Sequence, residues 1–231
     1  MPRLSRCDLC NERGAFPLPG LARSRISAGM IRRAFLLASL ALVVAPSASG
    51  APTPRRPSTP GTRVKIDTNL GPIVIALEMK RAPITSRNFL AYVDQKLFDG
   101  TTFYRAARTS GAPKEGFVEG GINNAMGHAL KAIAHEPTNV TGIRHVDGTV
   151  SMARNAPGTA MGDFFIVVGP GEYLDASRKD PGYAAFGHVV SGMAVVHKML
   201  AQPTYKGGWS TETVGQSMIH PIRILSARRL P

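Results

Sequence analysis

The stretch Gly148–Gly169, GTVSMARNAPGTAMGDFFIVVG, is the most informative part of the chain. It places two strand-like runs, Thr149–Ala153 and Phe164–Val168, on either side of a ten-residue link rich in Gly, Ala and Pro. Apolar, β-branched and aromatic residues fit a pleated, half-buried surface, whereas Gly and Pro suit the link. The pattern predicts a rigid frame that holds an exposed backbone loop, with Phe165 beside it, an arrangement suited to binding an extended peptide. A plain hairpin with a long turn is the alternative interpretation.

Short strand patterns and two helix patterns occupy most of the chain outside this stretch. Val64–Thr68 and Ile73–Leu77 flank the turn residues Asn69–Pro72, which predicts a hairpin. Further strands are expected at Thr101–Arg108 and Pro221–Leu230, and helices at Ser86–Gln95 and Met193–Ala201. Many short strands with only two helices predict an antiparallel barrel or sandwich capped by helices, because a parallel βαβ fold needs more crossover helices.

Met30 opens a segment that is typical of a secretory signal. A basic start, MIRR, is followed by the apolar run Ala34–Ala45 and by small residues, which predict cleavage near Ala48–Ala51. The apolar run is too short to span a membrane, and the Pro- and Arg-rich sequence after it disfavours a core helix. We expect an upstream extension at 1–29, a signal peptide at 30–50, a Pro-rich linker at 51–62 and a folded domain at 63–231. The expected location is periplasmic or secreted, with no stable membrane insertion after cleavage.

Cysteine usage and charge exclude several classes of function. Cys7 and Cys10 both precede the expected signal, so the mature protein should have no disulfide and no thiol nucleophile. The first 50 residues carry seven Arg against Asp8 and Glu12, which reduces the formal net charge from +13 to +8. The remaining Lys and Arg are scattered, which favours a solvated surface over a nucleic-acid site. We expect a monomer that binds no nucleic acid; a basic polyanion-binding protein remains an alternative that rests on charge alone.

Several short motifs follow one another in a specific order. DGTTFYR at Asp99–Arg105 precedes FVEGG at Phe117–Gly121, and the opening stretch, EYLD at Glu172–Asp175 and the pair Phe186-Gly187 come after them. Together with the hairpin and the first helix, this ordered set resembles the cyclophilin family of peptidyl-prolyl isomerases over roughly Val64–Leu230. The resemblance implies a mainly β fold, a closed eight-stranded antiparallel β-barrel capped by two α-helices, with a surface groove that takes an X-Pro dipeptide.

The resemblance also assigns roles to individual residues. It implies that Arg105 is the catalytic residue and that Phe165 forms the floor of the proline pocket. Phe117 stands where the family usually has Met, and Tyr183 where many members have His. The expected substrate-binding residues are Phe103, Phe117, Glu119, Ala153, Arg154, Asn155, Asp163, Phe165, Tyr173, Leu174 and Tyr183. Proline-containing peptides and unfolded exported proteins are the expected partners, and neither a cofactor nor a metal is expected.

The physical chemistry of the X-Pro bond agrees with this assignment. Isomerisation is slow because resonance makes the C–N bond partly double, with a barrier of ~18–20 kcal/mol. A guanidinium that donates hydrogen bonds more strongly to the twisted amide, where the prolyl nitrogen has recovered its lone pair, binds the transition state better than the ground state. Arg suits this role because it stays charged and its donors are held in a stiff fork.

The chain also departs from the family pattern. Glu119 and Asp163 each stand where Gln is usual, and both substitutions place a carboxylate near Arg105. A Glu–Arg pair either holds the guanidinium in place or draws its donors away from substrate. Tyr173 replaces a Trp that many cyclosporin-binding members carry, which implies weak cyclosporin sensitivity. The segments 106–116 and 176–182, which border the expected groove, are longer than the common pattern.

Other catalytic constellations are weaker. His128, His135, Glu136 and His145 lack metal-ligand spacing, and Ser151 lies in no G-x-S-x-G elbow. We therefore expect a peptidyl-prolyl cis-trans isomerase that accelerates X-Pro isomerisation during the folding of exported proteins. A non-catalytic peptide-binding chaperone on the same barrel is the alternative, motivated by the two carboxylate substitutions.

Overall fold

The structure, a computed structural model, describes residues 61–123, 125–208 and 210–231. The expected upstream extension, the signal peptide and nearly all of the expected linker lie outside these residues. Within the described part of the chain, every helix is too short or too polar to cross a membrane.

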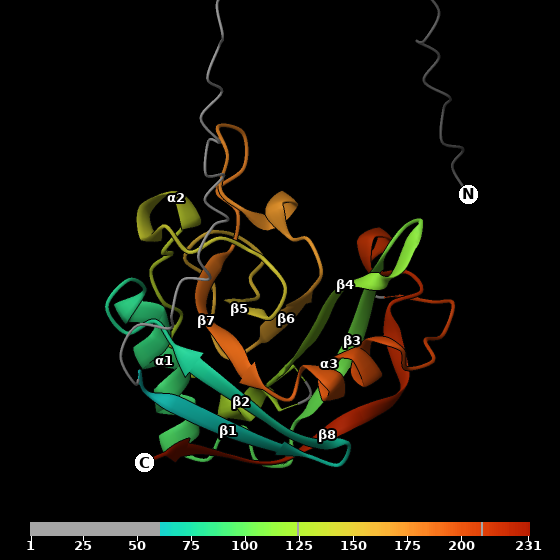
Figure 1. Cartoon of the computed structure of the whole chain (residues 1–231), viewed down its shortest axis with the longest axis horizontal. Helices are drawn as coiled ribbons and strands as arrows, with labels where there is room; N and C mark the ends of the chain where they lie inside the picture. Colours follow the sequence, from blue (N-terminus) through green and yellow to red (C-terminus); the bar gives the residue numbers. More distant parts are fainter. Residues whose placement is uncertain (1–60, 124, 209) are drawn as a thin grey trace, which may run out of the picture. The chain divides into compact units, whose positions relative to one another are not determined.

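Eight antiparallel strands form a closed barrel (Figure 1). Around the barrel they follow the order β1-β2-β7-β5-β6-β4-β3-β8, so the first strand pairs with the last, Val64 opposite Arg229. The predicted hairpin is present, with Val64 opposite Ile75, and so is the pairing of the two runs in the opening stretch, with Ser151 opposite Phe165. The strands are β1 Arg63–Thr68, β2 Gly71–Leu77, β3 Thr102–Thr109, β4 Ala112–Gly121, β5 Thr149–Met152, β6 Phe164–Val168, β7 Ala184–Ser191 and β8 Ser217–Leu230. The predicted mainly β barrel is confirmed.

In the part of the chain that the structure describes, three α-helices accompany the barrel: α1 Pro83–Asp94, α2 Thr138–Thr141 and α3 Met193–Leu200. The two predicted helices correspond to α1 and α3, whereas α2 is a single turn and too short to show a helical period. Helix α1 begins at Pro83, where the missing N–H costs no hydrogen bond. The carboxylate of Glu136 accepts hydrogen bonds from the backbone N–H groups of Ile84 and Thr85, at 3.2 and 2.7 Å. Glu136 therefore caps this helix.

The main core fills the barrel interior. Alternate residues of β1 and β2 point inward, and Val64, Ile66, Ile73 and Ile75 are fully buried. Aromatic rings pack between the barrel and α1, with centroids 5.1 to 5.5 Å apart, in the set Phe89, Tyr92, Phe98, Phe103, Phe164 and Phe186.

A second, smaller apolar cluster lies outside the barrel wall. Strand β6 is buried on both faces, because Phe164 points into the barrel and Phe165 points outward under a cover of other side chains. We call this set the outer cluster: Phe165, Val167 and Leu174, with Phe117, Ala153 and Tyr183 partly buried against them. The chain needs no such cluster to close its barrel, so its position marks a candidate binding surface.

Candidate active site

Phe165 is the centre of the outer cluster. Its ring lies 5.1 Å from the ring of Phe117 and 5.3 Å from that of Tyr183, the latter edge to face. Leu174, at the end of the short 3-10 turn η2 (Glu172–Leu174), completes the apolar wall. The sequence expectation placed these four side chains together, and the structure brings them together. The result is an apolar surface suited to a ring-shaped aliphatic group.

Arg105 lies at the edge of this surface, on β3. Its Nε donates to Gln216 Oε1 at 2.8 Å and its Nη1 donates to Glu119 Oε2 at 2.7 Å. The guanidinium carbon stands 5.0 Å from the centre of the Phe117 ring. Nη2 makes no hydrogen bond to the described residues. The guanidinium is thus held at Nε and Nη1, while Nη2 remains for a bound peptide.

The two carboxylates that replace Gln have different positions. Glu119 pairs with Arg105 and also accepts a hydrogen bond from the Tyr104 hydroxyl at 2.9 Å. Asp163 makes no ion pair with Arg105; its Oδ1 accepts the backbone N–H of Asn123 at 2.9 Å. Burial raises the pKa of the Asp163 carboxyl to about 6, and the negative charge of Glu119 adds to the effect. Burial and the same negative charges also raise the pKa of Tyr104, so the phenol stays protonated as a donor.

The link between β5 and β6 carries the next three expected residues. The Ala153 backbone N–H donates to the Asp163 carbonyl oxygen at 2.9 Å, and the Ala153 side chain packs on the outer cluster. Arg154 Nε donates to the carbonyl oxygen of Gly182 at 3.1 Å, and its guanidinium lies 4.9 Å from the Tyr183 ring centre. Asn155 is exposed. The exposed backbone loop predicted from the opening stretch is therefore present beside Phe165.

Phe103 corrects one sequence expectation. Its side chain is fully buried in the barrel interior, with its ring 5.5 Å from that of Phe164, so a role in contacting substrate is wrong. Strand alternation would place Phe103 and Arg105 on the same face, but the register of β3 shifts between these two residues. The irregularity turns Phe103 into the core and Arg105 out toward the outer cluster.

A hollow of about 290 Å³ adjoins Arg105. Tyr173, one of its lining residues, is 61% exposed, as expected for a residue at the rim of a groove. The hollow is lined by Arg105, Ala107, Arg108, Thr109, Phe117, Tyr173 and Gln216. Phe117 belongs to both the outer cluster and this wall, so the two sites are adjacent.

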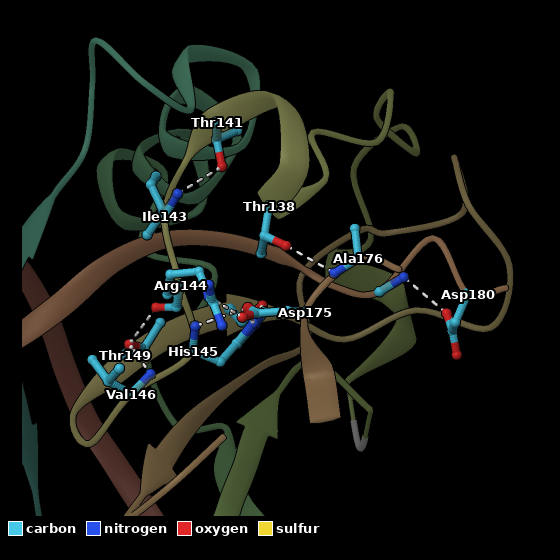
Figure 2. A network of polar contacts seen from close by, with 12 residues as sticks. Thr138, Thr141, Ile143, Arg144, His145, Val146, Thr149, Asp175, Ala176 and Asp180 are labelled. Carbon is cyan, nitrogen blue, oxygen red and sulfur yellow. Dashed lines mark hydrogen bonds and ion pairs between the residues drawn. The ribbon is translucent and has the colours of Figure 1, made fainter. Parts of the chain in front are cut away.

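A polar network behind the outer cluster was not expected from the sequence. Figure 2 shows Arg144 and His145 turned toward Asp175, which accepts hydrogen bonds from the backbone N–H of His145 at 3.0 Å and contacts its ring Nδ1 at 2.8 Å. The other ring nitrogen of His145 lies 2.9 Å from Ser151 Oγ, and the ring stacks on Phe165 with centroids 6.1 Å apart. Burial lowers the pKa of His145, so the ring is neutral. Ser151 and His145 are completely buried, so this Ser-His-Asp series supports the pocket floor rather than attacking a substrate.

Gln216 is a further site residue that was not predicted from the sequence. It lies 111 positions from Arg105 in the chain, yet it fixes the Nε of that side chain. No local pattern marks it; only the antiparallel pairing of β3 with β8, Arg105 opposite Ser217, brings it to the site.

These features together define a class: a small β-barrel that presents a fixed guanidinium beside an apolar surface on its outer wall. The family follows from comparison with known proteins. The profile of the family described as Cyclophilin type peptidyl-prolyl cis-trans isomerase/CLD matches residues 63–228. The chain belongs to this family, as the ordered motifs indicated.

Individual relatives and solved structures agree. The chain is 37% identical over 170 residues to a peptidyl-prolyl cis-trans isomerase of Acinetobacter baylyi, which covers 72% of this chain and 85% of the relative. It is 35% identical to peptidyl-prolyl cis-trans isomerase A of Dickeya dadantii, over 69% of this chain and 82% of that protein. A crystal structure of a Cryptosporidium parvum cyclophilin type isomerase in the presence of the dipeptide Ala-Pro has the same fold, with a TM-score of 0.59 at 20% identity, covering 73% of this chain and 99% of the other.

Proposed function

We propose that this cyclophilin-family protein accelerates the cis-trans isomerisation of X-Pro bonds in exported proteins as they fold, with Arg105 as the catalytic residue. The observation that carries the proposal is the position of the Arg105 guanidinium, 5.0 Å from the ring of Phe117, which in turn packs 5.1 Å from Phe165. Relatives that bear the isomerase name, from Acinetobacter baylyi and Dickeya dadantii, support the same reaction.

The geometry suggests how each part acts. A prolyl ring seated on Phe165, between Phe117 and Leu174, has its amide at the edge where Nη2 of Arg105 remains available. As the amide twists, the prolyl nitrogen regains its lone pair and accepts a stronger hydrogen bond, which lowers the barrier. The exposed backbone of the β5–β6 link holds the rest of the peptide in an extended conformation. No bond in the substrate breaks, so the reaction needs no nucleophile.

Peptide exchange measured by NMR tests the proposal. A peptide that contains one X-Pro bond is mixed with the purified protein, with the Arg105→Ala variant, or with a control variant, Arg87→Ala, which removes an exposed Arg from α1. We expect fast cis-trans exchange with the parent protein and the control, and exchange slowed at least a hundredfold with Arg105→Ala. Equal exchange rates with and without the parent protein would sink the isomerase function.

A second candidate function rests on the Glu119–Arg105 ion pair. Glu119 Oε2 accepts a hydrogen bond from Arg105 Nη1 at 2.7 Å, and a guanidinium held by a carboxylate is a weaker donor to a peptide amide. If this effect dominates, the groove binds proline-containing segments without catalysis and the protein acts as a chaperone. Suppression of client aggregation that survives Arg105→Ala, in a parent protein with no exchange activity, would favour this candidate.

The exported location is a separate part of the proposal, since it depends on residues 30–50. We expect cell fractionation to place the protein outside the cytoplasm, and N-terminal sequencing of that material to begin near Ala48–Ala51. Recovery of the uncleaved chain from the cytoplasm alone would contradict export without affecting the isomerase function.

A further inference from the structure

The hollow beside Arg105 takes much of its wall from the segment 106–116. Ala107, Arg108 and Thr109, three of its seven lining residues, come from the segment 106–116. The backbone here is fixed: the register of β3 against β4 shifts between Arg108 and Thr109, and Gly116 opposite has φ +137. A Cβ at Gly116 would stand 1.9 Å from the Ala107 carbonyl oxygen, so only Gly fits. The position of Arg108 is thus built into the hairpin.

Arg108 differs from the other arginine in the wall in how its charge is balanced. The charge of Arg105 is balanced by Glu119 at 2.7 Å. Arg108 donates instead to two neutral oxygens, Thr204 Oγ1 at 3.3 Å and the Gln202 carbonyl. It makes no ion pair with any of the residues that the structure describes. A half-buried guanidinium with only neutral partners is a site for an anionic group.

The remaining walls suit a carboxylate on a short aliphatic stem. Ala107 and Phe117 contribute apolar side chains to the wall, and Thr109 and Tyr173 are lining residues that carry hydroxyl groups. The hollow adjoins the expected proline position, because the same Phe117 ring packs 5.1 Å from Phe165. Successive Cα atoms of a peptide are about 3.8 Å apart, so a residue beside a proline seated on Phe165 reaches the hollow.

We propose that this hollow is a specificity subsite that binds the side-chain carboxylate of a Glu or Asp adjacent to the substrate proline, with Arg108 as the residue that recognises it. The inference rests on the proposed isomerase function and adds a substrate class to it: acidic X-Pro or Pro-X segments. A Lys in the same position is disfavoured, because two arginines line the hollow and only one of them is balanced by a carboxylate.

Matched peptides test the subsite. Each peptide is acetylated and amidated, so that the side chain is its only carboxylate, and carries Glu, Gln or Lys either before or after a single proline. NMR exchange gives kcat/KM and NMR titration gives Kd for each. We expect the Glu peptide to exceed its Gln counterpart about fivefold in kcat/KM at one of the two positions. The ratio of kcat/KM for the Glu peptide to that for the Gln peptide should fall toward one as the salt concentration rises.

Variants separate the charge of Arg108 from its contribution to folding. In Arg108→Gln the Glu-to-Gln ratio should fall to about one, in Arg108→Lys part of the ratio should remain, and in the control Arg87→Gln it should be unchanged. Thermal unfolding identifies any variant that fails to fold, and a ratio taken within one protein is insensitive to partial loss of active material. A ratio near one in the parent protein, or a ratio that survives Arg108→Gln, overturns the subsite.

The two readouts distinguish this inference from the proposed function. If no peptide undergoes faster exchange but the Glu peptide binds more tightly through Arg108, the isomerase function fails and the subsite stands. If the neutral peptides exchange quickly and the Glu peptide gains nothing, the isomerase stands and the subsite fails. A preference that appears only when the C-terminus is left as a free carboxylate would assign the hollow to chain ends and overturn the side-chain assignment.

Discussion

Replacing Asp163 by Asn should stabilise the protein most above pH 6. Burial, with Glu119 nearby, raises the pKa of this carboxyl from its ordinary value of 3.8 to about 6. The difference corresponds to about 3 kcal/mol between the two protonation states. Below pH 4 the Asp163 carboxyl is protonated in both the folded and the unfolded chain, so it does not reduce the free energy of unfolding. Between pH 4 and 6 the unfolded chain releases its proton first, so the free energy of unfolding falls as the pH rises, and above pH 6 the full penalty is present.

Urea denaturation of the parent protein and of Asp163→Asn, at pH 5 and at pH 7.5, measures this penalty. Asn cannot ionise, and its oxygen still accepts the Asn123 N–H. The advantage of the variant over the parent should therefore be larger at pH 7.5 than at pH 5, by about 1.4 kcal/mol. Asp147→Asn is the control, because that exposed carboxylate also accepts one backbone N–H, from Gly169 at 2.8 Å. An Asp163→Asn advantage that is independent of pH, or larger at pH 5, would refute the reasoning.

Three further predictions concern the pocket and its support. Glu119→Gln removes the balancing charge from Arg105 and should raise kcat/KM in peptide exchange several-fold. It should also lower the free energy of unfolding by about 1 kcal/mol. Reduced activity of the variant would show instead that the ion pair positions the guanidinium. Phe165→Ala removes a side chain that is 2% exposed, so urea denaturation should show a loss of about 3 kcal/mol and peptide titration a markedly weaker Kd. Burial lowers the pKa of His145 below 6.5, so acidification through pH 6.5 protonates the unfolded chain first and reduces the free energy of unfolding. In His145→Gln this part of the pH dependence should disappear. Its persistence in the variant would exclude His145 as the cause.

The elements that could be predicted from the sequence are those whose side chains follow a strict local period. Strands β1 and β2 alternate buried and partly exposed residues on either side of a two-residue link, and β6 is an unbroken apolar run, so their limits agree closely with the expectation. Strand β4 was not predicted as a strand, because Lys114, Glu115 and its glycines hide any alternation. Its pairing partners, β3 and β6, stabilise it instead.

The site could be predicted only as far as the motifs reached. Arg105, Phe117 and Phe165 lie in conspicuous local patterns, and the structure brings them together. Phe103 was misplaced because the register shift in β3 leaves no mark in the sequence. Gln216 and the contact between His145 and Asp175 depend on strand pairing and loop packing between distant segments, which a single sequence does not encode locally.

The pairing of β1 with β8 has a consequence for how the chain reaches its folded state. The barrel is a ring whose closing seam joins residues near position 64 to residues near position 229, so the ring stays open until the last strand is available. Contacts so far apart in sequence form late, because a long loop must be closed before they contribute any stability. A chain that emerges from its N-terminal end first therefore remains incompletely folded until its final residues appear. Such a chain stays incompletely folded throughout its synthesis, and its barrel closes only once β8 is complete.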